Sequence, residues 1–416
     1  MSGSRSWSLA SPAVSQVIVL SFAALSTGCS DGPAPPAVTV ADSAAVEIVT
    51  SRGPGWAAED AWRLELDLEV GDTEGPNAFG RLLDVAPRRA GGFWVVDAQR
   101  VQVRAYDEAG AEVLAFGRAG EGPGEFRSVG RLGERPDGGI SVGGRMPVEL
   151  YQFDRDGAPL GAERVPPGLY RELPSDAAAA RPPLGPSIGE WGFADDGSAF
   201  VQAATIDAPV DEIVRSDVVL RPAEGERPAV RFASWEAPAM RGGPGGEIAL
   251  LEPDASWSPL SGGGLWFTRG DAYELRRYDA AGELRVILRR PASRLPLTAD
   301  IRAAYLASFE GETDNPGTLA ALERGVFPDS LPATAGLWAS EGDGHLWVGV
   351  LDPDLAWRVE GPNALDIFDA AGTYVGRLPI PDRLRPTRIT SGYVYGIWLD
   401  ELEVTHARRY RIVRPE

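Results

Sequence analysis

The chain has 416 residues and a formal net charge of −20, from 60 acidic and 40 basic residues. So acidic a surface repels phosphate backbones, which argues against nucleic-acid binding. No lysine occurs, so lysine Schiff-base chemistry is excluded. A single cysteine, Cys29, allows no internal disulfide. A fold of this length must therefore be held together by apolar burial.

The first 28 residues predict a signal peptide. Arg5 supplies a positive start, and residues 13–25 form an apolar stretch too short to span a bilayer comfortably. Cys29 follows directly after Gly28, and this junction resembles the lipid-attachment site of bacterial lipoproteins. It departs from that pattern at Ser26, where Leu, Val or Ile is usual. The expectation is an exported lipoprotein of the cell envelope, periplasmic or on the outer surface, with ordinary secretion and a leftover thiol as the alternative.

The segment after the signal peptide predicts a tether. Residues 29–43 begin with the lipidated cysteine and are rich in proline, alanine and small polar residues, which disfavour a packed structure. A single folded domain is expected over residues 44–416.

The domain repeats itself with a period of 47 residues. The sequence EGPNAF at 74–79 returns as EGPGEF at 121–126. A period of this size is typical of an array of similar units that cannot bury their apolar faces alone. The clearest unit, residues 82–117, has four short apolar segments separated by Gly and Asp turns. It predicts one four-stranded blade of a β-propeller.

Four copies of one turn mark four blades. Each consists of an aromatic residue, an aspartate, two further residues and a glycine: Tyr106–Gly110, Phe153–Gly157, Tyr278–Gly282 and Phe368–Gly372. Two degenerate blades are expected around residues 195–220 and 392–413. The fold class is therefore all-β, a six-bladed propeller, although a seventh blade between residues 138 and 263 stays open.

Two further features complete the predicted architecture. The segment from Trp62 to Val70 has no blade of its own and should pair with the C-terminal strand, which closes the ring and removes an exposed sheet edge. Residues of about 298–327 have helical spacing and predict a helical insertion between blades 4 and 5. The insertion is either a lid or padding.

The string from Phe116 to Phe126 (FGRAGEGPGEF) resembles the linker of NHL-repeat propellers. The resemblance runs from about Trp62 to the C-terminus, and the whole chain is similar to bacterial six-bladed propeller lipoproteins. It implies architecture and export, and it supplies no catalytic residues. NHL-type lyases hold zinc with several histidines, and only His345 and His406 occur here. That activity is therefore not expected.

Calcium is the more plausible ion. Lactonase-type propellers place carboxylate and amide side chains around a central ion, and the resemblance makes Asp84, Glu190 and Asp195 the leading candidates. The wider set also contains Asp97, Asp196 and Asp343. The alternative is ordinary turn chemistry, because aspartate followed by glycine is common in blade turns. No cofactor other than this possible calcium is expected.

The expected function is a binding or interaction module for a protein, peptide or glycan, attached to the membrane through a lipid on Cys29. Trp191 and Trp338 fall near the inner strands and are candidate ligand contacts, with packing as the alternative. The second functional hypothesis is a calcium-dependent hydrolase or lactonase with its site in the central channel. No catalytic residue is identified, and the balance is against an enzyme.

Overall fold

The structure is a computed structural model. It describes residues 38–43, 45–53, 55–145, 147–165, 188–207, 214–222, 229–237, 250–291, 294–307, 322, 325–340, 342–355 and 361–415. All of these belong to one compact unit, Pro36–Glu416. The predicted signal peptide, Cys29 and the first part of the tether lie outside the described residues.

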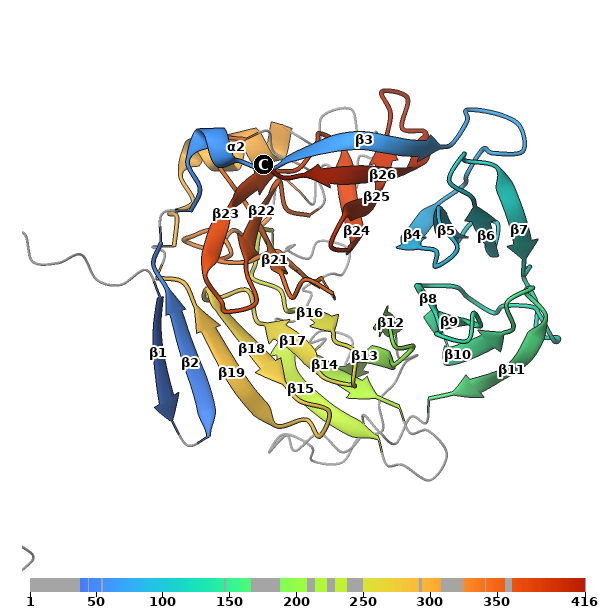
Figure 1. Cartoon of the computed structure of the whole chain (residues 1–416), viewed down its shortest axis with the longest axis horizontal. Helices are drawn as coiled ribbons and strands as arrows, with labels where there is room; N and C mark the ends of the chain where they lie inside the picture. Colours follow the sequence, from blue (N-terminus) through green and yellow to red (C-terminus); the bar gives the residue numbers. More distant parts are fainter. Residues whose placement is uncertain are drawn as a thin grey trace, which may run out of the picture. The chain divides into compact units, whose positions relative to one another are not determined.

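The chain forms a six-bladed β-propeller (Figure 1). Each blade is an antiparallel sheet whose first strand lies at the axis, and each first strand contacts the first strand of the next blade around the complete ring. Blade 1 contains β4 (Leu82–Pro87), β5 (Phe93–Asp97), β6 (Gln102–Tyr106) and β7 (Glu112–Phe116). Blade 2 contains β8 (Leu132–Glu134), β9 (Ile140–Arg145), β10 (Val148–Phe153) and β11 (Pro159–Arg164). Blade 3 contains β12 (Ile188–Phe193), β13 (Ala199–Asp207), β14 (Val214–Arg221) and β15 (Val230–Ala237).

The second half of the ring follows the same order. Blade 4 contains β16 (Ser256–Pro259), β17 (Leu265–Thr268), β18 (Glu274–Tyr278) and β19 (Leu284–Arg289). Blade 5 contains β20 (Gly336–Ala339), β21 (Leu346–Val350), β22 (Ala364–Phe368) and β23 (Tyr374–Pro379). Blade 6 contains β24 (Leu384–Ile389), β25 (Tyr393–Leu399), β26 (Thr405–Val413) and the N-terminal strand β3 (Arg63–Val70). The prediction of six four-stranded blades is confirmed.

The predicted closure of the ring is also confirmed. Strand β3 pairs antiparallel with β26, from Val70 opposite Ala407 to Arg63 opposite Val413. Residues from the two ends of the domain thus share one sheet, and they lie side by side in Figure 1. Because the last blade receives its fourth strand from the N-terminal side, the ring has no open edge at this position.

The predicted tether is wrong at its C-terminal end. Residues Val38–Ser43 form strand β1, which makes a hairpin with β2 (Val46–Ser51). Strand β2 pairs in parallel with β19 of blade 4, with Ile48 opposite Ile287. The hairpin therefore extends the outer edge of the four-stranded blade 4 into a six-stranded sheet. The apolar residues Val46 and Ile48 stand on either side of Glu47, which is the alternation of a strand.

The core lies between the blades. Six apolar clusters are formed, one at each junction of neighbouring blades around the ring. Trp94 of blade 1, for example, packs in one cluster with Ile140 and Phe153 of blade 2. A blade buries both of its faces only when it has two neighbours, which is the physical reason for the repeat in the sequence.

The four copies of the turn have the same geometry. In the first, the Asp107 carboxylate accepts hydrogen bonds from the amides of Ala109 and Ala111, both at 2.9 Å, and Gly110 has a φ of 79°. This left-handed conformation favours glycine. Blade 6 has a fifth copy that the sequence analysis missed. There Asp400 accepts from the amides of Leu402 and Val404, and Glu403 takes the left-handed position with a φ of 60°.

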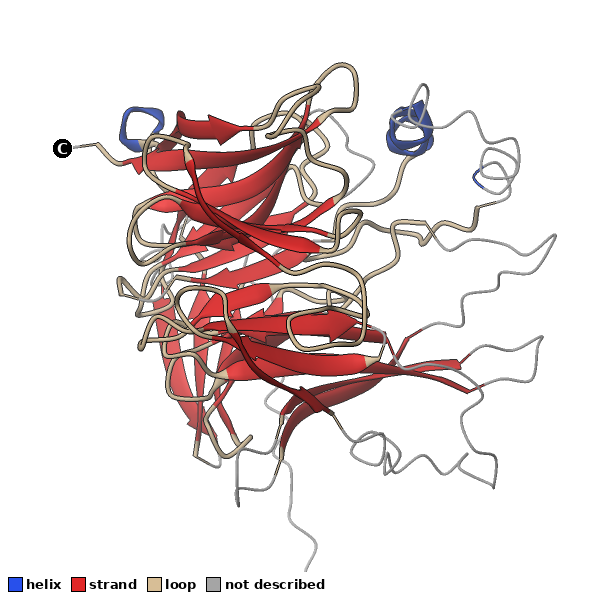
Figure 2. Ribbon diagram, turned by 90° about the vertical axis from the view of Figure 1, so that its right-hand side faces the viewer, coloured by secondary structure: helices blue, strands red, loops and turns tan. Residues whose placement is uncertain are grey.

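The predicted helical insertion is present in part. Helix α2 (Ala299–Ala307) lies between β19 and β20, and Figure 2 shows it standing away from the strands at one side of the ring. Tyr305 packs in a small separate cluster with Leu250 and Leu322. Most of residues 308–324 lies outside the described residues. A second short helix, η1 (Ala58–Asp60), precedes β3.

Candidate binding site in the central channel

A cavity of about 280 Å³ lies on the axis of the propeller. All six blades contribute to its wall, chiefly through their first strands: Pro87, Arg131, Glu190–Asp195, Ser256–Pro259, Gly336–Ala339 and Arg385–Thr390. The backbone hydrogen bonds of six sheets hold these strands in place. The wall is therefore rigid before any ligand arrives.

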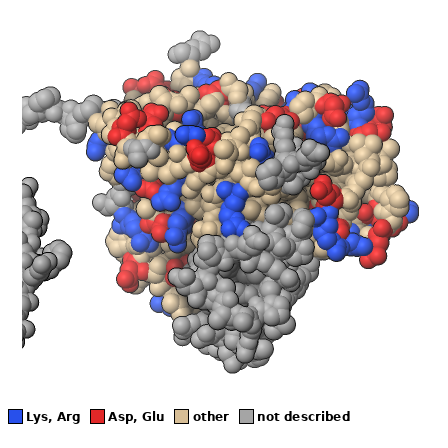
Figure 3. Space-filling view, turned by 90° about the horizontal axis from the view of Figure 1, so that it is seen from below, with Lys and Arg blue, Asp and Glu red and all other residues tan. Residues whose placement is uncertain are grey.

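Arginines are the main charged groups of the wall. Arg131, Arg385 and Arg388 line the cavity, together with the carboxylates Glu190 and Asp195. This local concentration of positive charge contrasts with the net charge of −20 of the whole chain. The outer face in Figure 3 differs, because arginine and carboxylate side chains lie interspersed over it.

Arg388 joins three blades at the axis. Its Nη2 donates to Asp84 Oδ2 of blade 1 at 3.0 Å and to the backbone oxygen of Leu132 of blade 2 at 3.2 Å. Burial lowers the pKa of the Arg388 guanidinium, the charge of Asp84 raises it, and the charge of Arg131 lowers it again. Arg131 thus acts on Arg388 as a repelling neighbour.

Asp84, a candidate calcium ligand, is engaged in this pair. The residue is fully buried, and Oδ2 also accepts the amide hydrogen of Leu132 at 3.0 Å. Its other oxygen, Oδ1, has no hydrogen-bond partner within the part of the chain that the structure describes. Asp84 therefore lies behind the wall as the counter-ion of an arginine.

Glu190 and Asp195, the other two candidates, both line the cavity. Glu190 lies 3.5 Å from Nη2 of Arg145, and its side chain is 51% exposed. Asp84, Glu190 and Asp195 thus lie on, or directly after, first strands of their blades. However, among the described residues no three His, Cys, Asp or Glu side chains gather as the ligands of a metal ion would.

The wider set of carboxylates has structural tasks away from the cavity. Asp97 accepts hydrogen bonds from the amides of Gly80 and Gln99, at 2.8 and 3.0 Å. Asp196 accepts from Ser198 at 2.9 Å and also from Gly262. These are turn and loop contacts, as the alternative interpretation held.

Asp343 and the two histidines lie in polar clusters that contribute no residue to the cavity wall. Asp343 accepts from Ser340 Oγ at 2.8 Å and pairs with Arg414 at the same distance, and His345 Nδ1 lies 3.0 Å from its carboxylate. His406 lies 3.6 Å from a carboxylate oxygen of Glu69 and at an equal distance from one of Asp400. The cavity wall includes neither histidine.

Tryptophans form the apolar part of the wall. Trp191, a predicted candidate, lines the cavity but is only 1% exposed, and its indole nitrogen donates to the backbone oxygen of Gly144 at 2.9 Å. Trp338, the other candidate, is half-buried in the wall, and its ring lies over Gly336, where a Cβ would come within 2.6 Å of it. Of the two, Trp338 has ring surface left for a ligand.

Trp257 is a wall residue that the sequence analysis did not find. It is half-buried, and its indole nitrogen donates to Gln202 Oε1 at 2.7 Å across the junction of blades 3 and 4. A signal was available, because this first strand precedes, within the same blade, the turn Tyr278–Gly282 that the sequence analysis identified. The strand and its tryptophan could have been placed from it.

Two smaller hollows adjoin the cavity. One, of about 70 Å³, shares Arg131, Glu190, Trp191 and Arg385 with it and adds Arg145. The other, of about 240 Å³, shares Ser256, Ala335 and Gly361 with it and is further lined by Glu252, Asp254 and Tyr305 of helix α2. The arginine-rich hollow thus borders blades 1, 2, 3 and 6, whereas the acidic hollow borders blades 4 and 5 and the helical insertion.

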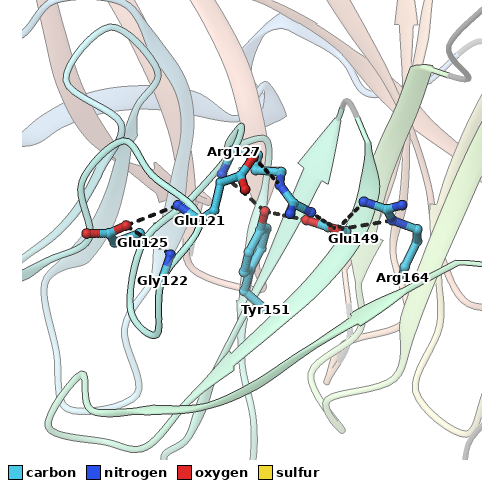
Figure 4. A network of polar contacts seen from close by, with 7 residues as sticks. All are labelled: Glu121, Gly122, Glu125, Arg127, Glu149, Tyr151 and Arg164. Carbon is cyan, nitrogen blue, oxygen red and sulfur yellow. Dashed lines mark hydrogen bonds and ion pairs between the residues drawn. The ribbon is translucent and has the colours of Figure 1, made fainter.

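The glycine-rich linker GEGPGEF is a structural turn. The backbone amides of Glu121 and Gly122 donate hydrogen bonds to the carboxylate of Glu125, at 3.0 and 2.9 Å (Figure 4). Phe126 is fully buried in the junction of blades 1 and 2. An internal carboxylate therefore already occupies the place that an external anion would need.

Several solved structures are similar to this chain. No protein-family model and no curated protein matches the chain. Among solved structures, a member of the DUF4221 family from Bacteroides vulgatus is 10% identical, with a TM-score of 0.48, covering 86% of this chain and 100% of the other. Virginiamycin B lyase from Staphylococcus aureus is 10% identical, with a TM-score of 0.40, covering 85% and 100%. The calcium-binding protein regucalcin from Agrobacterium tumefaciens is 12% identical, with a TM-score of 0.40, covering 84% and 96%.

At these identities none of the three neighbours assigns an activity to the chain. The sheet order itself defines the class, a six-bladed β-propeller with a charged central channel. Within the ranges described, no helix is long and apolar enough to cross a membrane.

Proposed function

We propose that this protein is an exported, lipid-anchored binding module that receives its ligand in the central channel. The ligand is a small molecule, or a group that protrudes from a protein, peptide or glycan. The observation that carries this proposal is the cavity of about 280 Å³, walled by the first strands of all six blades. Rigid walls with a few polar groups and exposed aromatic surface are typical of ligand sites.

The arrangement of charge supports binding over calcium-dependent hydrolysis. Calcium takes six to eight oxygen ligands. Here Asp84 is held by Arg388 at 3.0 Å, and Glu190 has Arg145 as its neighbour at 3.5 Å. A cation entering the channel would meet these arginines as well as the carboxylates. The site is better suited to a ligand that the arginines attract.

A variant that fills the channel tests the proposal. Ala335 lines both the cavity and the larger hollow. Ala335→Trp should therefore exclude ligands from the channel. Ala109→Trp is the matched control, because Ala109 lies exposed in the outer turn of blade 1. Purified wild-type and variant chains would be screened by thermal shift against sugars, sugar acids and short peptides. Each screen would be run with EDTA and with calcium.

We expect ligands that raise the midpoint of wild type and of the control but not of Ala335→Trp, since only native-state binding raises it. Ligands that act equally on all three chains would contradict a site in the channel. A calcium-dependent shift together with lactone or ester turnover would favour the hydrolase instead.

The lipid anchor is tested separately. Labelling of the wild-type chain with a fatty acid in a bacterial host, and its loss in Cys29→Ser, is the expected result. Equal labelling of both chains, or labelling of neither, would contradict attachment at Cys29.

A further inference from the structure

Arg131 is the least compensated charge in the channel. It lies directly before β8, is half-buried, and lines both the cavity and the smaller hollow. Within the part of the chain that the structure describes, its guanidinium makes no ion pair and no side-chain hydrogen bond. One of its electrostatic neighbours is Arg388, a like charge. A partly buried cation next to another cation is unfavourable until an anion arrives.

The total charge around Arg131 indicates how much negative charge a ligand should carry. Among the residues that the structure describes, the cavity and the smaller hollow together carry four arginines, namely Arg131, Arg145, Arg385 and Arg388. Three carboxylates stand against them: Glu190 and Asp195 in the wall, and Asp84 behind it. One positive charge remains. A carboxylate carries a single negative charge at neutral pH, whereas a phosphate monoester carries about 1.5 to 2.

The rest of the channel indicates what the anion is attached to. Trp338 and Trp257 are half-buried in the same wall and offer ring surface to the carbon skeleton of a ligand. The larger hollow, on the side of blades 4 and 5, is lined by Glu252 and Asp254. These carboxylates disfavour a second anionic group there. The ligand should therefore point its anion toward the arginines and its uncharged body toward the tryptophans.

From this geometry we infer that the channel binds an organic monocarboxylate, with the carboxylate on Arg131 and the neighbouring arginines and the uncharged body against Trp338. The inference rests on the proposed function, because it names the ligand chemistry of the same channel. A guanidinium binds a carboxylate through two parallel hydrogen bonds, which gives both affinity and orientation. The carboxylate comes from a free acid or from an acidic unit of a glycan.

The test uses galacturonate, its neutral counterpart galactose, trigalacturonate and inorganic phosphate as probes. Binding to the purified full-length chain would be measured by isothermal titration calorimetry. We expect galacturonate to bind at least about tenfold more tightly than galactose and than phosphate, as the loss of a charge-assisted hydrogen bond implies. Tighter binding of trigalacturonate supports a glycan as the source, and equal binding supports a free acid.

Arg131→Gln is the decisive variant. It should weaken galacturonate binding about tenfold or more and leave galactose binding unchanged. Arg155→Gln is the control, because Arg155 is exposed and donates to the backbone of Asp137 in an outer turn of blade 2. A thermal unfolding scan of each variant would verify that the ring is intact.

Three results would overturn the inference. These are galactose binding as tightly as galacturonate, unchanged galacturonate affinity in Arg131→Gln, or no binding of any acidic probe. The proposed function fails differently, when ligands found in the screen bind equally well to Ala335→Trp. A neutral ligand could fail to bind Ala335→Trp and still bind Arg131→Gln. That result would support the proposed binding module and contradict the inference of a carboxylate ligand.

Discussion

Arg388 and Asp84, which are 304 positions apart in the sequence, form an ion pair of 3.0 Å at the axis of the propeller. Arg388 comes from β24 of the last blade and Asp84 from β4 of the first. The pair stands at the junction of blades 6 and 1, beside the cavity. The ion pair links two blades of the ring, and its arginine also lines the candidate site.

We predict that Asp84→Asn strongly destabilises the protein. The substitution leaves the mostly buried guanidinium of Arg388 without its counter-ion, and loss of one partner of a buried pair costs about 3–5 kcal/mol. The free energy of unfolding from urea titrations measures the effect. The double variant Asp84→Asn with Arg388→Met should recover part of the loss, because it also removes the stranded charge.

Asp195→Asn is the matched control for this prediction. Asp195 lines the same cavity but is exposed. We expect a change within about 0.5 kcal/mol. Equal losses in Asp84→Asn and in the control would show that the pair does not stabilise the ring.

A second prediction concerns Gly143 of β9, which lies beneath the buried ring of Trp191. A Cβ at Gly143 would come within 2.0 Å of Trp191 Cγ. Gly143→Ala should therefore destabilise the protein by about 1–3 kcal/mol, because neither the ring nor the first strand can move aside. Gly161→Ala is the control, since no atom lies within 4 Å of a Cβ built there. A loss as large at Gly161 as at Gly143 would contradict this account.

The fold was largely predictable from the sequence because the repeat is a local signal. The turn from Tyr106 to Gly110 and its copies need an aspartate that caps the turn and a glycine with positive φ. Both requirements depend on the residue type, so the same residues recur at these positions in several blades. The closing strand Arg63–Val70 was predictable for a related reason, because the last blade otherwise lacks a fourth strand.

The site was less predictable because it depends on contacts between distant blades. Asp84, Glu190 and Asp195 lie on or next to first strands, and the repeat fixes which strands come first. The repeat says nothing of the charges that face them. The arginines that face them, Arg388 among them, were not found, and neither was the addition of β1 and β2 to blade 4.

The third prediction is a loss of stability in acid that depends on Glu149. This buried carboxylate of β10 accepts hydrogen bonds from Tyr151 at 2.6 Å and from Arg127 at 2.8 Å, and it pairs with Arg164 at 3.0 Å (Figure 4). Burial alone would raise the pKa of Glu149, but the hydrogen bonds from Tyr151 and Arg164 and the charge of Arg127 hold it below its usual value.

The sign follows from the lowered pKa. The stabilisation is present in full above the unfolded value of about 4.3, and it is lost as the pH falls through the lower pKa of the folded state. Glu149→Gln should lose about 1–3 kcal/mol at pH 7 and show a shallower loss of stability in acid than wild type. Urea titrations between pH 7 and pH 3 measure both effects. Glu163→Gln on the exposed strand β11 is the control, and an acid profile of Glu149→Gln parallel to that of wild type would contradict the prediction.

The last prediction is a stabilising substitution in the fifth copy of the turn. Glu403 has a φ of 60° at the place that glycine takes in the other four copies. The left-handed region costs a residue with a Cβ about 1–2 kcal/mol, and the greater freedom of glycine in the unfolded chain offsets about 0.5–1 kcal/mol of that. Glu403→Gly should therefore stabilise the protein by about 0.5–1 kcal/mol. Glu401→Gly in the same turn is the control. Because Glu401 does not have positive φ, this substitution should be neutral or destabilising, and a stabilisation equal to that of Glu403→Gly would show that backbone strain at Glu403 is not the cause.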